Sequence, residues 1–151
     1  MNIRKAEDED GRMIIQWLTT KQDCEFVTGK TLFSLENYQS WFDSQDQVGF
    51  MLLEKNKPVA YGEIWVDEEE QDLELAHLVV DPCFRNKGVG KKLVQFLLQE
   101  CASYSYPTIY MRVTPENDRA LSCYLGVGFV EDESMRPLFN SKWIWLKKRN
   151  G

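Results

Sequence analysis

The sequence contains a single histidine, four cysteines and no long uninterrupted run of apolar residues. The cysteines stand far apart along the chain and form no C-x-x-C pair. No apolar stretch approaches the roughly 18 residues that cross a membrane, and residues 1–10 are too polar for a secretory signal. These absences predict a soluble, reduced and cytoplasmic protein, and no metal site or membrane partner is expected.

An excess of basic residues is also missing. With 18 lysines and arginines against 24 acidic residues, the formal net charge is −6, which argues against a nucleic-acid-binding face. No repeat, low-complexity run or domain linker interrupts the chain. Its 151 residues, of which 43% are hydrophobic, are enough for one sizeable core, so we expect a single domain over residues 1–151.

The most informative stretch runs from Leu73 to Leu98. Its first part, Leu73 to Val80, is mostly apolar and ends at Asp81-Pro82, which is typical of a strand that stops at a turn. Its last part has apolar residues at helical spacing, which predicts an amphipathic helix beginning near Gly88. The residues of this stripe are Val89, Leu93, Val94, Leu97, Leu98 and Cys101.

The start of this predicted helix carries cations where a helix usually prefers acids. The first turn has a partial positive charge and unpaired N–H groups, so each cation there costs roughly 0.3–1 kcal/mol. Gly88 and Gly90 leave the backbone open to close approach, and a bound phosphate would turn the repulsion into attraction. A solvated basic helix start with a glycine turn is the alternative. The cations are Arg85, Lys87, Lys91 and Lys92.

Two common phosphate-binding loops do not fit these residues. A P-loop would need glycine at position 85 and serine or threonine at position 92, where the chain has Arg85 and Lys92. A dinucleotide-binding fingerprint would need glycine at position 93, which is Leu93. The pattern that does fit is R-x-x-G-x-G between a strand and a long helix.

The rest of the chain alternates between strand and helix patterns, although residues 21–30 show no clear period. The predicted order is β-α-α-β-β-β-α-β-α-β-β, an α/β fold around one mixed sheet. Helices are predicted around Met13, Leu35, Leu93 and Leu121. The predicted strands are Asn2–Lys5, Val48–Glu54, Pro58–Val66, Leu73–Val80, Thr108–Val113, Phe129–Glu131 and Lys142–Lys147.

A second motif, from Asn117 to Phe129, reads NDRALSCYLGVGF. Together with the R-x-x-G-x-G loop it resembles the GNAT superfamily of N-acetyltransferases, in which that loop holds the pyrophosphate of acyl-CoA. Gly126 departs from the family pattern, because a longer residue is usual there. The resemblance implies a single-domain, mixed and mostly antiparallel sheet flanked by helices. The residues that match the N-x-x-A…Y-x-x-x-G-F pattern are Asn117, Ala120, Tyr124, Gly128 and Phe129.

The resemblance also implies a reaction. The protein would transfer an acetyl group from acetyl-CoA to a primary amine by direct attack in a ternary complex, and many family members form homodimers. The acceptor, a small molecule or a protein amine, is not identified. A non-catalytic acyl-CoA-binding or sensing module of the same fold and an enzyme that uses a longer acyl chain are the alternatives.

The family's cosubstrate site implies a set of binding residues in this chain. Backbone groups at the end of the strand, at Val79 and Val80, would pair with the pantetheine, and an N–H there would polarise the thioester carbonyl. The full set is Leu78, Val79, Val80, Arg85, Asn86, Lys87, Gly88, Val89, Gly90, Lys91, Asn117 and Tyr124.

Two residues are implied to be catalytic. Glu74 stands six residues before Val80, the position of the general base in histone-type members, although a solvent-facing glutamate would fit as well. Tyr124 matches the tyrosine that protonates the leaving thiolate, although an aromatic packed between helix and sheet would also fit. His77, the only histidine, is predicted to point away from Glu74 because strand residues alternate, unless a β-bulge reverses it.

Overall fold

The computed structural model describes residues 1–135 and 142–151. It contains a seven-stranded sheet in the order β1-β2-β3-β4-β5-β7-β6. The strands are β1 (Asn2–Lys5), β2 (Gln47–Glu54), β3 (Lys57–Asp67), β4 (Asp72–Val80), β5 (Thr108–Val113), β6 (Val130–Glu131) and β7 (Ile144–Arg149). The α-helices are α1 (Gly11–Trp17), α2 (Lys21–Thr28), α3 (Leu35–Asp43), α4 (Val89–Cys101) and α5 (Asp118–Val127), and 3₁₀ turns span Asp8–Asp10, Pro82–Phe84 and Glu133–Met135.

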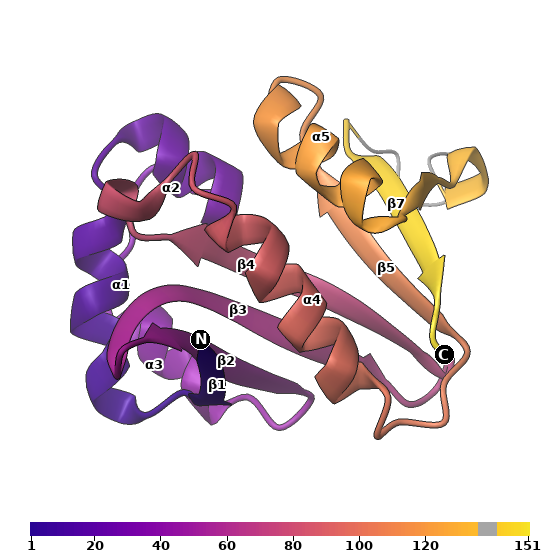
Figure 1. The fold of residues 1–151 in the computed structure, drawn as a ribbon, viewed down its shortest axis with the longest axis horizontal. Coiled ribbons are helices and arrows are strands. Elements are labelled where there is room, and N and C mark those ends of the chain that lie inside the picture. The colour runs from indigo at the N-terminus through magenta and orange to yellow at the C-terminus, as the bar shows by residue number, and fades with distance from the viewer. Residues whose placement is uncertain (136–141) are drawn as a thin grey trace.

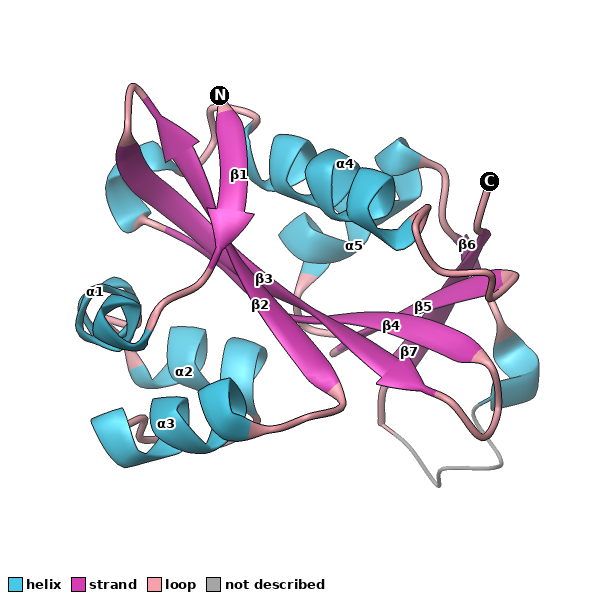
Figure 2. Cartoon of the chain, turned by 90° about the horizontal axis from the view of Figure 1, so that it is seen from below, coloured by secondary structure: helices cyan, strands magenta, loops and turns pink. Residues whose placement is uncertain are grey.

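Helices cover both faces of this sheet (Figures 1 and 2). The helices α1, α2 and α3 lie on one face, and α4 and α5 lie on the other. Among the described strands, β4 and β5 form the one parallel pair, and all other neighbours are antiparallel. The predicted mixed, mostly antiparallel sheet flanked by helices is thereby confirmed.

The helix α2 is an addition to the predicted order. Cys24 is the one buried residue of α2, and the sequence of the helix has no clear apolar stripe. The capping residues at its two ends are therefore the local signals that mark it as a helix. The Thr20 hydroxyl accepts a hydrogen bond from the Asp23 N–H at the start, and Gly29 ends the helix in the left-handed region with φ of 77°. These are ordinary capping signals at both ends of a short, partly exposed helix.

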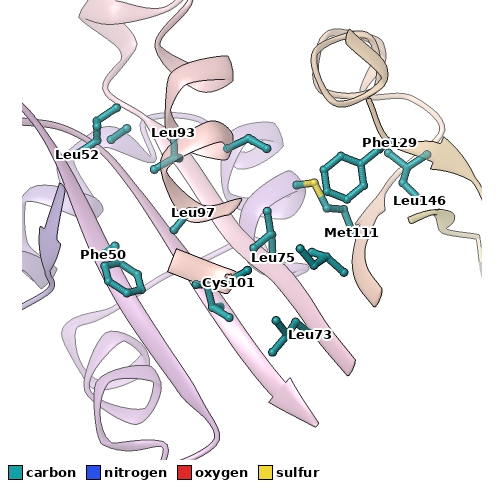
Figure 3. Close-up of a cluster of buried hydrophobic side chains, with 14 of the residues drawn as sticks. Phe50, Leu52, Leu73, Leu75, Leu93, Leu97, Cys101, Met111, Phe129 and Leu146 are labelled. Carbon is teal, nitrogen blue, oxygen red and sulfur yellow. The ribbon is translucent and has the colours of Figure 1, made fainter. Parts of the chain in front are cut away.

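The main hydrophobic core lies between α4 and the sheet (Figure 3). Leu93, Leu97 and Cys101 from α4 are fully buried against side chains of β2, β4 and β5. Truncating one such leucine typically costs about 2–5 kcal/mol. A second cluster, which includes Ile14, Trp17, Tyr38 and Tyr61, fills the space between the sheet and the helices α1 and α3. None of the described helices is long and apolar enough to cross a membrane.

The strands β4 and β5 are paired over only part of their length. Their parallel register begins at Asp72↔Thr108 and ends at Leu75↔Met111, after which the two strands diverge (Figure 1). In the same region the pairing of β4 with β3 shifts between Tyr61 and Glu63, which marks a β-bulge. The backbone edge of β4 that faces β5 therefore has no strand partner within the described residues beyond Leu75.

Candidate active site

The diverging strands enclose a cavity of about 230 Å³ that α2 and α5 also wall. Of the residues predicted for catalysis or cosubstrate binding, Glu74, Leu78, Asn117 and Tyr124 contribute to its lining. The predicted loop residues 85–91 lie at the start of α4 and not in this lining. The other lining residues are Phe26, Val27, Thr28, Gly29, Trp65, Leu75, Ala76, His77, Met111, Arg112, Val113 and Trp143.

Glu74 on β4 is paired with Arg112 on β5. The Arg112 Nε atom donates to Oε2 of Glu74 over 2.7 Å, and Nη2 donates to Oε1 over 3.3 Å. Burial raises the pKa of the Glu74 carboxyl, and the neighbouring Arg112 charge opposes part of that rise. Glu74 thus faces the cavity and not bulk solvent, and its partner Arg112 is a site residue that sequence patterns did not single out.

His77 lies on the same face of the sheet as Glu74, so the prediction that it points away is wrong. The reason is the β-bulge, where His77 itself has a left-handed backbone with φ of 52°. The extra residue breaks the alternation of side chains and turns the imidazole toward α3. There the Trp41 ring stacks on it, with ring centroids 3.7 Å apart and planes 15° apart.

Glu63 on β3 holds the His77 ring and is fully buried. Its carboxylate accepts hydrogen bonds from His77 Nδ1 at 2.8 Å, Trp65 Nε1 at 2.8 Å, Tyr61 Oη at 2.5 Å and Gln47 Nε2 at 3.1 Å. Four donors compensate for the removal of this carboxylate from water. No sequence pattern singled out Glu63, although the alternation of Tyr61, Glu63 and Trp65 places two donors and one acceptor on a single face.

Tyr124 reaches the cavity from the middle of α5. Burial raises the pKa of its phenol, so the group keeps its proton at neutral pH, as a general acid must. The preceding residue, Cys123, also has a raised thiol pKa because it is partly buried, which makes its sulfur a poor nucleophile. Asn117 has a structural task, because its Oδ1 accepts a hydrogen bond from the Ala120 N–H over 3.3 Å and caps α5.

The loop before α4 has the conformation of a helix start without a side-chain cap. Gly88 occupies the N-cap position in the left-handed region, with φ of 80°, and Asn86 is also left-handed with φ of 62°. The first turn of α4 contains no acidic residue. The N–H groups at this end are therefore available to an anion. Arg85 forms an ion pair with Asp23 of α2 at 3.1 Å, and the Lys87 ammonium lies 5.5 Å from the Phe84 ring centroid.

The end of β4, the start of α4 and the middle of α5 meet close to this loop. A Cβ atom at position 90 would lie 3.8 Å from Val80 Cγ2 and 3.9 Å from Cys123 Sγ. Val79 and Val80 pair with Tyr61 and Ala60 of β3, and their opposite backbone edge faces the space between β4 and β5. An extended molecule bound at the α4 start could therefore continue along the free edge of β4 toward Tyr124.

The fold of this chain is also found in solved structures of N-acetyltransferases. The spermidine N-acetyltransferase from Vibrio cholerae, solved with CoA and spermine, aligns over 99% of this chain and 95% of its own with a TM-score of 0.80 and 15% identity. The GNAT domain of S. lividans PAT aligns over 97% of this chain and 89% of its own, with a TM-score of 0.80 and 12% identity. These likenesses show the fold.

The sequence itself shows the family. The model of the acetyltransferase (GNAT) family matches residues 13–129, and the chain belongs to that family. An uncharacterized N-acetyltransferase of Methanocaldococcus jannaschii is 28% identical over 118 residues, which cover 74% of this chain and 50% of that protein. The [ribosomal protein bS18]-alanine N-acetyltransferase of Escherichia coli is 27% identical over 84 residues, or 56% of this chain and 55% of that enzyme. The matches thus span about half the length of these curated relatives.

Proposed function

We propose that this protein transfers the acetyl group of acetyl-CoA to a primary amine by direct attack in a ternary complex. The observation that carries the proposal is that Glu74 and Tyr124 line one cavity, next to an uncapped helix start suited to the pyrophosphate. Family membership supports acetyl transfer in general, and the arrangement of these residues supports the particular steps.

The cosubstrate binds first through its phosphates. Backbone N–H groups from Gly88 to Lys91 receive the pyrophosphate, and the nearby lysines add charge. The pantetheine continues along the free edge of β4 at Leu78, Val79 and Val80, as an added strand would. A backbone N–H at this edge then donates to the thioester oxygen as negative charge develops on it.

The acceptor enters the cavity as an ammonium ion and must lose a proton before it attacks. At pH 7 this deprotonation costs roughly 4–5 kcal/mol for a lysine-like amine, so a carboxylate close to the nitrogen is needed. We assign this role to Glu74, because burial raises its proton affinity and its carboxylate faces the cavity.

The neutral amine nitrogen then attacks the carbonyl carbon of the thioester. A C–N bond forms, the tetrahedral intermediate collapses, the C–S bond breaks, and Tyr124 gives its proton to the departing sulfur. The nitrogen loses its second proton to water as it becomes the amide, and the Tyr124 phenolate takes a proton back from water, so one proton is released to the solvent for each ammonium that is acetylated. The raised thiol pKa of Cys123 disfavours a route through an acetylated cysteine.

The proposal is tested by measuring CoA release from acetyl-CoA with a panel of primary amines, with acetyl-CoA binding followed in parallel by calorimetry. Turnover with at least one amine supports the enzyme. Tight binding of acetyl-CoA with no turnover on any amine would instead identify a binding module of the same fold, and no binding would overturn the assignment of the loop.

A further inference from the structure

The charges inside the cavity bear on which amine the protein accepts. Among the described lining residues, Glu74 and Arg112 are the two that carry a formal charge, apart from the titratable His77. They are paired side-on through Nε and Nη2 of Arg112, so Nη1 makes no hydrogen bond within residues 1–135 and 142–151. The remaining walls are mainly apolar or aromatic.

The Arg112 guanidinium group is held at the cavity wall, where it can bind a ligand. Its Cζ atom lies 4.9 Å from the ring centroid of Trp145, 5.5 Å from that of Trp65 and 5.8 Å from that of Trp143. Contacts with the faces of indole rings stabilise a guanidinium and limit its motion. Both Trp65 and Trp143 also line the cavity, so a cation fixed among these rings faces the same space as Glu74.

The charge balance of the occupied cavity distinguishes between classes of acceptor. A simple ammonium beside Glu74 would leave the site with an excess positive charge, because Arg112 already balances Glu74. A polyamine or an aminoglycoside would bring several more cations against Arg112. An acceptor that carries its own anion keeps the set neutral, and neutral sets of hydrogen-bonded charges are those that proteins tolerate at buried positions.

We infer that the acceptor is a zwitterion of the α-amino acid type with an apolar side chain, whose ammonium binds Glu74 and whose carboxylate binds Arg112. The inference rests on the proposed function. One carbon atom separates the two charged groups of such a molecule, which matches two oppositely charged side chains that touch each other. The cavity, at about 230 Å³, is smaller than the roughly 300–1,000 Å³ of sites for drug-sized ligands, which suits an acceptor of this size.

The apolar part of the acceptor has walls to contact. Phe26 and Val27 from α2 and Leu78 and Met111 from the diverging strands line the cavity together with the indoles. Burying an apolar side chain there is favourable by about 25 cal/mol per Å². An amino acid with a charged side chain would gain nothing from these contacts and would disturb the neutral set.

The test compares acceptors that differ in the carboxylate alone. The purified full chain is assayed with saturating acetyl-CoA and two pairs of acceptors: L-phenylalanine with 2-phenylethylamine, and L-leucine with isopentylamine. Spermidine is assayed as a polycationic acceptor. We expect kcat/KM for the amino acid to exceed that for its decarboxylated partner by about 10- to 100-fold, the range for a charge-assisted hydrogen bond. Equal rates, or a preference for the plain amine or spermidine, would overturn the inference and leave the proposed function standing.

Variants of Arg112 connect the preference to the structure. Arg112→Lys keeps the charge and loses the planar fork, so the ratio between L-phenylalanine and 2-phenylethylamine should fall toward one. Arg112→Gln should lower the ratio in the same way, provided that circular dichroism shows the variant to be folded. The control is Arg149→Gln, which replaces an exposed arginine at the far end of β7 and should keep the wild-type ratio. An unchanged ratio in Arg112→Lys would refute the assigned contact. Failure of all five acceptors would overturn the inference, and the wider panel of primary amines would then decide the proposed function.

Discussion

Glu63 and His77 lie on neighbouring strands at the bulge of β4, and the imidazole Nδ1 donates to the buried carboxylate over 2.8 Å. The contact holds His77 in a left-handed backbone conformation that a non-glycine residue seldom adopts. The Trp41 ring of α3 stacks on the His77 imidazole. The pair therefore fixes the bulge, and the bulge sets where β4 leaves β5 and where the cavity opens.

Glu63→Gln should destabilise the protein. An amide places an N–H group among four donors and leaves at least one buried group without a partner, which typically costs about 1–3 kcal/mol. Urea denaturation measures the loss, and Glu68→Gln in the exposed turn between β3 and β4 is the matched control. A change in unfolding free energy below about 0.5 kcal/mol, the range of ordinary surface substitutions, would contradict the structural role of this network.

The pH dependence of the reaction should report Glu74. A base must be ionised, and a carboxyl group is ionised above its pKa and protonated below it. Because burial raises the pKa of Glu74, kcat/KM should fall with decreasing pH at a higher pH than an exposed glutamate would give, whose pKa is about 4.3.

Glu74→Gln should remove this acidic limb and lower kcat by about 10²- to 10⁴-fold. Glu69→Gln, in the exposed turn, should retain both the limb and the rate. If the limb persists in Glu74→Gln, the proton acceptor is a different group, and His77 in the same cavity is the first to test.

Tyr124→Phe should impair chemistry and leave the fold intact. The phenol hydroxyl makes no hydrogen bond to any described residue, so its removal should change the free energy of unfolding by less than about 0.5 kcal/mol. Loss of the proton donor should lower kcat by about 10²- to 10⁴-fold, while calorimetry shows wild-type affinity for acetyl-CoA. Tyr106→Phe, outside the cavity, controls for the loss of a hydroxyl. Near-normal turnover in Tyr124→Phe would show that the thiolate leaves without its help.

Gly90→Ala should separate stability from cosubstrate binding. The new methyl group would meet its neighbours at ordinary distances of 3.8 and 3.9 Å, and alanine in the first turn of α4 favours the helix by up to about 1 kcal/mol. The same methyl group would stand between the phosphates and the backbone N–H groups, so the Kd for acetyl-CoA should rise about tenfold or more. Gly126→Ala on α5, where no atom lies within 4 Å of the new Cβ, is the control that should leave Kd unchanged.

Local signals in the sequence were enough to predict most of the framework. Asn2–Lys5 and Thr108–Val113 form strands with the predicted bounds, and the α4 helix begins one residue after Gly88. Apolar residues alternate along Thr108–Val113 and recur at helical spacing in α4, whereas Asn2–Lys5 contains the one apolar residue Ile3. The short helix α2 escaped prediction because it buries little and is determined by Thr20 and Gly29 at its ends.

The parts of the site that were missed depend on contacts between distant segments. Glu63 and Arg112 each interrupt an apolar strand, and a solvent-facing residue would produce the same sequence pattern. Their partners, His77 and Glu74, are identified only when β3, β4 and β5 are placed side by side. The orientation of His77 was mispredicted because alternation fails at a bulge, and the bulge is a property of the β3–β4 register. Such information belongs to the pairing of strands and is absent from either strand alone.

The limited pairing of β4 with β5 has a consequence for the lifetime of the protein in a cell. Along the sheet, β1–β4 are joined to β5–β7 through the short register from Asp72↔Thr108 to Leu75↔Met111. Acetyl-CoA bound between the α4 loop and Tyr124 would contact both parts, so its binding energy would also resist their separation. At 100 times its Kd, a ligand specific for the folded state adds about 2.7 kcal/mol to the free energy of unfolding. Resistance of the chain to proteolysis would then rise and fall with the supply of its own cosubstrate.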